Sequence, residues 1–345
     1  MGQSLHKPHQ NKADDGSMSS SSSSKYSRRA YHAGSWYDAD KNALDATLTK
    51  YLDDASKNIK TPSNNNTTEG LPRACICPHA GFSYSGPTAA YSYLALKEAL
   101  ERNSSICTVV VLHPSHHVYL ESAALSGAGT IETPLMNLQV DDALRGKLLS
   151  TGKFQIMDQR VDEHEHSGEM QYPFIAKILS MVCPQREIKV LPIMVGSIRT
   201  NKEESYGKLI ASHLAEESIF TVISSDFCHY GQRFSYTPRP RPSEASEKHI
   251  NEVYEYIEYL DRKGMDLIEL QQPGAFADYL REYSNTICGR HPIAVWLNAV
   301  VANSENGTEE LDVRFVRYEQ SSRARSINDS SVSYASAVAR FITGS

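Results

Sequence analysis

The amino-acid sequence predicts an α/β protein, a single large layered domain whose central, largely internal sheet is flanked by helices. Segments rich in apolar and β-branched residues alternate along the chain with segments of helical spacing. The strand expected over 106–112 is apolar almost throughout, which is typical of a strand covered on both faces. No change of composition divides the 345 residues into two halves, so one domain is expected over 30–343.

The expected elements follow one another in a regular order. Residues 40–55 place leucines on one helical stripe, and a β-prone run follows at 73–77. Residues 87–102 are expected to form a helix that begins with proline, which suits a first helical turn. After the strand 106–112, we expect strands over 187–195 and 219–223 around a helix over 202–216, helices over 244–262 and 292–302, and late strands over 311–318 and 331–341.

Three polar stretches interrupt this pattern. Residues 1–28 contain an unbroken serine run and cannot bury enough apolar surface to offset the entropy of ordering, so a disordered tail is expected. Residues 57–70 include three consecutive asparagines and are expected to form a surface loop. Residues 236–243 carry alternating prolines, which favour a second, extended surface loop.

Composition excludes several classes of partner and cofactor. With 41 acidic against 35 basic residues, the net charge of −6 disfavours binding to nucleic acid. No apolar run approaches the roughly 20 residues of a membrane span. Neither glycine-rich phosphate-binding motif is present, so no nucleotide cofactor is expected. The start of the chain lacks a secretory apolar region, so we expect a cytoplasmic protein, with the nucleus as a second location. The oligomeric state is left open.

Histidines follow three of the expected strands. Ligands of open α/β sheets bind beyond the carboxyl ends of strands, so these turns are expected to converge on one crevice. A single histidine in such a turn is more often structural, but its repetition at three strand exits favours a shared metal or catalytic site. The side chains concerned are His79, His113, His116, His117, Asp226 and His229.

Other segments supply further candidates. Cys288 precedes an apolar helix, whose dipole favours the thiolate, and His291 lies in the same segment. His166 and Glu169 are three residues apart and can both face the crevice if a helix begins there. Trp36 either lines the site or packs in the core.

Six motifs together resemble the Memo family, named for a mediator of receptor-tyrosine-kinase-driven cell motility. They are HAGSWY (32–37), PHAGFSYSGPTAA (78–90), PSHHV (114–118), SSDFCHYGQRF (224–234), NTICGRHPI (285–293) and DSSVSYAS (329–336). The resemblance covers nearly the whole chain from about residue 30. It implies a fold similar to that of class III extradiol dioxygenases, which hold Fe(II) with two histidines and a carboxylate and cleave catechol rings.

The resemblance also implies roles for individual residues. His79 and His116 match the two histidine ligands, and Cys288 stands where the dioxygenases have glutamate. His229 matches the acid/base histidine, with Asp226 expected to orient it. A thiolate shifts the preference of the site toward copper while still permitting iron, so one Fe(II) or copper ion is expected and routine ring cleavage is disfavoured.

His113 departs from the family pattern, because glycine is common at this position before PSHH. Its side chain can add a ligand or clash with one.

Three functions are compatible with these residues. The first is a metal-dependent redox protein with a role in signalling or cell motility. The second is a non-catalytic adaptor that binds a peptide or phosphopeptide in the pocket of His79, His229, Cys288 and Trp36. The third is an active extradiol dioxygenase. Metal content, and its response to replacement of Cys288, distinguishes the first and third from the second.

Overall fold

Strands and helices alternate along the chain as the sequence predicts. The computed structural model describes residues 25–58 and 70–342. Its strands are β1 (Ser27–Arg28), β2 (Pro72–Cys77), β3 (Thr108–Pro114), β4 (Ala123–Leu125), β5 (Thr130–Ile131), β6 (Leu138–Val140), β7 (Phe154–Ile156), β8 (Lys189–Val195), β9 (Ile219–Ser224), β10 (His229–Tyr230), β11 (Leu311–Gln320) and β12 (Ser331–Phe341). Its helices are α1 (Lys41–Asn58), α2 (Phe82–Arg102), α3 (Asp142–Ser150), α4 (Gln159–His164), α5 (His166–Glu169), α6 (Tyr172–Val182), α7 (Thr200–Leu214), α8 (Pro242–Lys248), α9 (Val253–Glu269), α10 (Pro273–Tyr283) and α11 (Arg290–Glu305), with a 3-10 turn η1 (Gln232–Phe234).

The centre of the sheet is parallel. Strands β8, β3, β9 and β2 lie side by side in that order and run in the same direction, and β12 then pairs antiparallel with β2. β11 pairs antiparallel with β12, and β4 joins the edge of β8. Every residue of β2, β3 and β9 is buried, which confirms the central, largely internal sheet. Parallel pairing brings the carboxyl ends of β2, β3 and β9 to the same edge.

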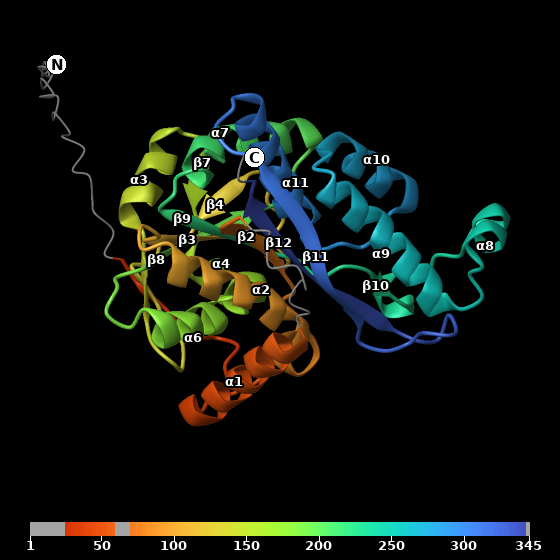
Figure 1. Ribbon diagram of the computed structural model, residues 1–345, viewed down its shortest axis with the longest axis horizontal. Helices are drawn as coiled ribbons and strands as arrows, with labels where there is room; N and C mark the ends of the chain where they lie inside the picture. Colours follow the sequence, from red (N-terminus) through yellow and green to blue (C-terminus); the bar gives the residue numbers. More distant parts are fainter. Residues whose placement is uncertain (1–24, 59–69, 343–345) are drawn as a thin grey trace, which may run out of the picture.

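Helices cover both faces of this sheet. On one face α2 packs against β2 and β12, and α1 and α6 pack against α2. On the other face α7 and α11 pack against each other and against β9 (Figure 1). Among the described residues, no helix is both long enough and apolar enough to cross a bilayer, in agreement with the sequence.

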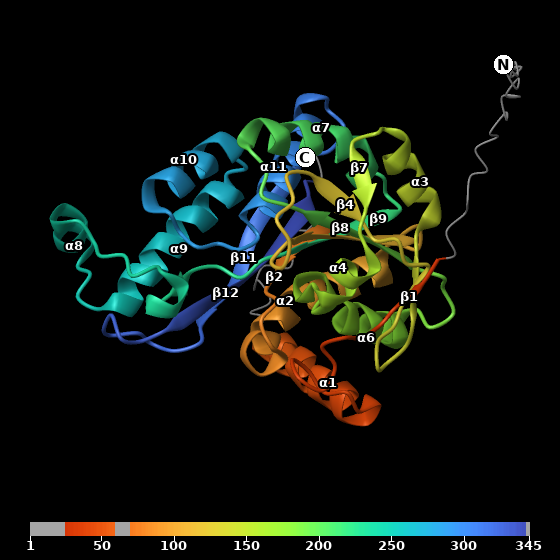
Figure 2. The same ribbon diagram turned by 180° about the vertical axis from the view of Figure 1, so that it is seen from behind.

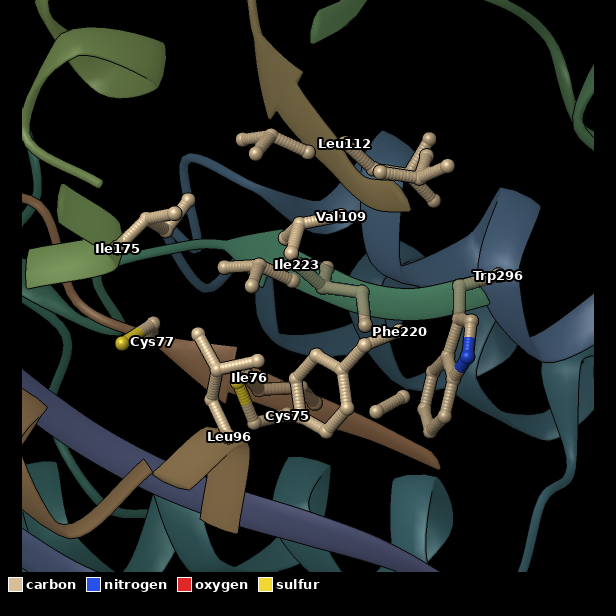
Figure 3. Close-up of a cluster of buried hydrophobic side chains, with 14 of the residues drawn as sticks. Cys75, Ile76, Cys77, Leu96, Val109, Leu112, Ile175, Phe220, Ile223 and Trp296 are labelled. Carbon is tan, nitrogen blue, oxygen red and sulfur yellow. The ribbon is translucent and has the colours of Figure 1, made fainter. Parts of the chain in front are cut away.

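The core between these layers is continuous. Figure 3 shows Ile76 of β2, Leu96 of α2, Phe220 of β9 and Trp296 of α11 within one cluster of buried side chains. Each of these side chains is at most 2% exposed, and burying one fully is worth roughly 1.5–3 kcal/mol. The core therefore fixes the strands whose ends carry the candidate site.

Two expected helices need correction. The helix expected to begin at Pro87 starts at Phe82, and Pro87 lies inside it, where only one backbone donor is lost. The helix expected over 244–262 is divided into α8 and α9, because His249 ends α8 in a left-handed conformation with φ of 54°. No residue of α8 is buried, and this helix projects from the end of the domain (Figure 2).

The boundaries of the polar stretches also change. The tail expected over 1–28 ends earlier, because Ser27–Arg28 form β1 and Arg28 is buried; residues 1–24 lie outside the described residues. Of the loop expected over 57–70, the first two residues complete α1, and 59–69 lie outside the described residues. Of the loop expected over 236–243, Tyr236 is buried and Pro242 begins α8, which leaves 237–241 as the connection.

Candidate metal centre

Three candidate ligands from separate parts of the chain meet at the carboxyl ends of the parallel strands. His79 follows β2, His116 follows β3, and Cys288 lies two residues before α11. One ligand atom of each residue lies within 4.8 Å of the other two. The sulfur of Cys288 is 3.1 Å from Nε2 of His79, and the two imidazole centroids are 5.2 Å apart. The structure therefore brings together the three residues that the sequence suggested as metal ligands.

The hydrogen bonds around His79 determine which ring nitrogen carries the proton. The hydroxyl of Ser224, at the end of β9, donates its only proton to the carbonyl of Ser167 over 2.8 Å. The same oxygen lies 2.7 Å from Nδ1 of His79, so Nδ1 must be the donor in this second bond. Nε2 therefore keeps its lone pair and faces Cys288, which is the tautomer that a metal ligand needs.

Glu165 orients the second imidazole. Its carboxylate accepts hydrogen bonds from the backbone N–H of His116 over 2.6 Å and from Nδ1 of the same residue over 2.8 Å. It also accepts from the backbone N–H and the hydroxyl of Ser167, over 3.0 and 2.7 Å. The side chain of Glu165 is only 1% exposed, so its carboxylate is shielded from water, whereas the side chain of His116 is 26% exposed. The Nδ1 proton is thus fixed, and Nε2 is the atom of His116 left for a ligand bond.

The backbone of Asp226 supports the sulfur of Cys288. Its N–H donates to Sγ over 3.3 Å, an interaction that favours the thiolate. The carboxylate of Asp226 accepts from the backbone N–H of His79 over 2.8 Å, so this residue connects two of the candidate ligands. Burial raises the pKa of the Cys288 thiol, and the hydrogen bond with His116 acts in the opposite direction. Metal binding would require the thiol to lose its proton.

A stack of rings borders the three ligands. His166 shares a second group of ligand atoms with His116 and Glu165, again within 4.8 Å. The ring of His166 stacks on His116 with centroids 4.5 Å apart and packs against Trp36 at an angle of 35°, with centroids 4.4 Å apart. His117 approaches the same ring edge-on at 5.8 Å. Burial is the main cause that lowers the pKa of His166 to about 3, so this ring is neutral at neutral pH.

Backbone carbonyls orient the ring of His229. Its Nδ1 lies 2.9 Å from the carbonyl of Phe227 and 3.1 Å from that of Thr286, so Nδ1 donates and Nε2 keeps its lone pair. Asp226, which the sequence suggested as the orienting group, hydrogen-bonds to His79 through its carboxylate. Burial is the largest effect that lowers the pKa of His79. The backbone N–H of His229 donates to the hydroxyl of Thr286 over 2.7 Å, which places His229 beside the segment that carries Cys288.

Two other expected site residues have different surroundings. His113 is buried, and its Nδ1 lies 3.1 Å from both the carbonyl of Pro114 and the hydroxyl of Ser167. It belongs to neither group of ligand atoms found in the described part of the chain. His291 lies on α11, and its Nδ1 is 2.6 Å from the carboxylate of Glu203 on α7. His113 therefore contacts Ser167, a neighbour of the candidate ligands, and His291 lies between two helices.

Comparison with known proteins shows the family. A family model described as Memo-like protein matches residues 28–338. The chain belongs to the Memo-like family. Protein MEMO1 of Danio rerio is 42% identical over 308 residues, which cover 89% of the chain and 95% of that protein. Protein MEMO1 of Homo sapiens is 41% identical with the same coverage. The memo-1 homolog of Caenorhabditis elegans is 42% identical over 324 residues, 93% of the chain and 85% of that protein.

These relatives confirm the resemblance predicted from the six motifs. Among solved structures, an uncharacterized protein of Escherichia coli K12 aligns with 75% of the Memo-like chain and 98% of its own, with 16% identity and a TM-score of 0.42.

Several residues that build the Memo-like site were not singled out from the sequence. Glu165 and Ser224 orient the two histidines, and the only local sign of Glu165 was the alternation of acidic residues and histidines over 162–166. Glu169, which was expected to support the site, accepts hydrogen bonds from Nδ1 of His32 over 3.1 Å and from Nη1 of Arg28 over 2.7 Å. No local pattern marks these partners, because 137 and 141 positions separate them from Glu169.

Replacing Gly289 with alanine is expected to disturb the Memo-like site directly. An added Cβ would lie 2.4 Å from Cβ of Ser225 and 2.5 Å from the carbonyl oxygen of Ser224, and neither atom can move freely. We expect a loss of stability of about 1–3 kcal/mol and metal binding at least about tenfold weaker, because Cys288 and Ser224 must separate. Chemical unfolding and chelator competition measure the two effects. Gly274→Ala is the control, since nothing lies within 4 Å of its added Cβ; equal behaviour of the two variants would contradict the prediction.

A buried carboxyl on α9 supports the loops behind the site. Asp261 is fully buried and accepts hydrogen bonds from the backbone N–H of Cys228, the amide of Asn285 and the hydroxyl of Tyr318, over 3.2, 2.8 and 2.9 Å. Burial is the main cause that raises its pKa to about 6. In the unfolded chain the same group titrates near its ordinary pKa of about 3.9.

This difference predicts a pH dependence of stability. Below about pH 4 Asp261 is protonated in both the folded and the unfolded protein. As pH rises, the unfolded protein releases this proton first, so the free energy of unfolding falls until about pH 6, where the folded protein releases it too. Asp261→Asn removes this titration. We expect the free energy of unfolding of the variant, relative to the unmodified protein, to rise by about 2 kcal/mol from about pH 4 to pH 7. Urea unfolding at both pH values tests this, and parallel pH profiles would refute it.

Proposed function

We propose that this Memo-like protein binds one transition-metal ion, iron or copper, through His79, His116 and Cys288. The observation that carries the proposal is the approach of the three ligand atoms to within 4.8 Å of one another. Nδ1 of His79 hydrogen-bonds to Ser224, and Nδ1 of His116 hydrogen-bonds to Glu165. In both imidazoles Nε2 is the nitrogen left to bind a metal. Hydrogen bonds of this kind are typical of metal-binding histidines, because they fix the tautomer and the ring orientation.

The donor set indicates which chemistry the site can support. Two imidazoles and a thiolate are softer than two imidazoles and a carboxylate, which suits copper and still permits iron. A bound ion of either kind would supply one-electron redox chemistry. Because Cys288 takes the place of the carboxylate ligand of class III extradiol dioxygenases, we propose a redox role linked to signalling or cell motility, within a fold related to those enzymes, instead of routine ring cleavage.

The residues around the ligands support defined tasks. His229 offers the lone pair of Nε2 as a proton acceptor, because its Nδ1 proton is fixed by carbonyls. Asp226 positions both His79 and Cys288 through its carboxylate and its backbone N–H. His166 contacts the rings of both Trp36 and His79, so these rings border the ligands.

The histidines favour this proposal over the capture of a phosphorylated peptide. Burial lowers the pKa of His79 and of His166, so these rings are uncharged at neutral pH and attract an anion weakly. Burial opposes charge on His116, but its hydrogen bonds with Cys288 and Glu165 prevail and raise its pKa to about 10. That charge is already balanced by the carboxylate of Glu165. His79 is thus already in the neutral form that binds metals, whereas His116 must release a proton when a metal binds.

A cytoplasmic or nuclear location is also part of the proposal. All six cysteines are free in the structure, which suits a reducing compartment.

Metal loading under anaerobic conditions tests the proposed function. The purified protein, incubated with Fe(II) or with Cu(I) and then desalted, is expected to retain about one equivalent of one of them. His213→Ala is the matched control, because His213 lies on α7 and hydrogen-bonds to Glu216; it should retain the same amount. Elemental mass spectrometry gives the stoichiometry. A protein that retains neither ion would overturn the proposal.

A further inference from the structure

We infer that the N-terminal strand β1, through Arg28, is a positioning element that sets the metal affinity of the candidate site. This inference rests on the proposed function and names a regulatory element for the same site. β1 precedes the six motifs of the family and contributes no ligand. Its influence passes through residues 162–169, which separate Arg28 from the two imidazoles.

The guanidinium of Arg28 holds this segment at several points. Its Nε donates to the carboxylate of Asp162 over 3.1 Å, and its Nη1 donates to the carboxylate of Glu169 over 2.7 Å. Nη2 donates to the backbone carbonyls of Asp162 and Glu165, over 2.8 and 3.0 Å. The side chains of Arg28, Asp162 and Glu169 are at most 2% exposed, so these bonds are shielded from competition with water. The rigid fork of arginine is suited to fixing such a set of acceptors.

The same segment carries the groups that orient both histidine ligands. The carboxylate of Glu165 holds Nδ1 of His116. The carbonyl of Ser167 accepts the proton of Ser224, whose oxygen in turn accepts the Nδ1 proton of His79. A shift of residues 165–167 would therefore rotate both imidazoles, although Arg28 touches neither ring.

The residues that follow β1 strengthen this connection. The carboxylate of Glu169 accepts the backbone N–H of His32 over 2.7 Å and the hydroxyl of Tyr37 over 2.9 Å. Between them, Trp36 packs against the ring of His166. The stretch from β1 to Tyr37 therefore contacts the segment that supports the ligands along its length, and docking of this stretch and ordering of the ligands favour each other.

Thermodynamic linkage makes this coupling reciprocal. If docking of β1 raises metal affinity by some factor, then metal binding must stabilise the docked strand by the same factor. The state of the metal site is thereby communicated to the start of the chain. A partner or modification that displaces β1 would weaken metal binding, and removal of the metal would loosen β1.

The experiment compares two buried arginines. Co(II) is the probe, because its thiolate charge-transfer absorption reports ligation by Cys288, and chelator competition gives its affinity. In the full chain, Arg28→Met is expected to bind Co(II) about 10- to 100-fold more weakly, with a weaker and shifted thiolate band. Arg73→Met is the matched control: Arg73 is also buried and paired with a carboxylate, that of Glu309 over 2.7 Å, but lies at the other end of β2 from His79. Its affinity should stay within about threefold of the parent.

Three results would overturn the inference. Unchanged affinity in Arg28→Met would show that the strand does not position the ligands. An equal loss in both variants would show a general effect of destabilisation. The third is hydrogen exchange of residues 27–37 that does not slow when Co(II) binds to the unmodified protein. If Arg28→Met does not fold, Arg28→Lys keeps the charge without the fork and is expected to show a smaller loss of the same kind. If the unmodified protein binds no Co(II), Fe(II) or Cu(I), the proposed function fails first, and this outcome is distinct from the other three.

Discussion

Cys288→Ser and His79→Ala are each expected to weaken binding of Cu(I) or Fe(II) by on the order of a hundred- to a thousandfold, the largest effect on the site that a single substitution should produce. Each variant removes one of the three proposed ligands His79, His116 and Cys288. Serine preserves the shape of cysteine but offers a hard, protonated oxygen in place of a soft thiolate. The loss should be greater for Cu(I) than for Fe(II), because copper gains more from sulfur.

The controls separate loss of a ligand from loss of structure. Cys107→Ser removes an exposed thiol at the opposite end of β3 from His116 and should leave metal affinity unchanged. Chemical unfolding of Cys288→Ser without metal should match that of the parent to within about 1 kcal/mol, since the substitution keeps nearly the same volume. A Cys288→Ser variant that binds both ions as tightly as the parent would show that the thiolate is not a ligand.

The convergence of the candidate ligands could be predicted from the sequence because its signal is local, and the resemblance to the Memo family then suggested which of the residues are ligands. His79 and His116 each follow an apolar strand, and parallel strands carry their carboxyl ends to one edge, so a pattern along the chain specifies a meeting in space. Cys288 precedes a helix, and its motif connected it with the two histidines. The central strands were predictable for a related reason, since burial on both faces leaves a continuous apolar run.

The supporting residues were not predictable, because their signal is not local. Arg28 lies in a polar stretch that resembles a disordered tail, and only its pairing with Glu169, 141 positions away, makes it a buried part of the fold. Glu165 has the same character: its neighbours in sequence resemble a solvated loop, whereas in the structure it is 1% exposed. The composition of a segment predicts whether it is ordered only on average, and one buried ion pair can order a segment whose composition predicts disorder.

A large expected loss of stability follows from breaking a second buried ion pair. Arg73→Met should lower the free energy of unfolding by about 3–5 kcal/mol, because it leaves the carboxylate of Glu309 without a counter-charge. Both side chains are 6% exposed, and Nε of Arg73 lies 2.7 Å from Oε1 of Glu309. The guanidinium also donates to the carbonyls of Ala215 and Glu216, each over 2.9 Å, at the end of α7. Urea unfolding measures the change.

A double variant shows whether the loss of stability comes from the missing hydrogen bonds of Arg73 or from the unpaired charge of Glu309. Arg73→Met with Glu309→Leu removes both charges, so it should recover most of the loss and lie within about 2 kcal/mol of the parent.

The pH dependence of stability makes the same distinction. Burial already raises the pKa of Glu309, and loss of Arg73 must raise it further. A group of this kind destabilises the fold only once ionised, so the deficit of the single variant should shrink as pH falls below that raised pKa. A double variant as unstable as the single one, with no change of the deficit between about pH 5 and pH 8, would mean that the helix-end carbonyls, and not the buried charge, account for the role of Arg73.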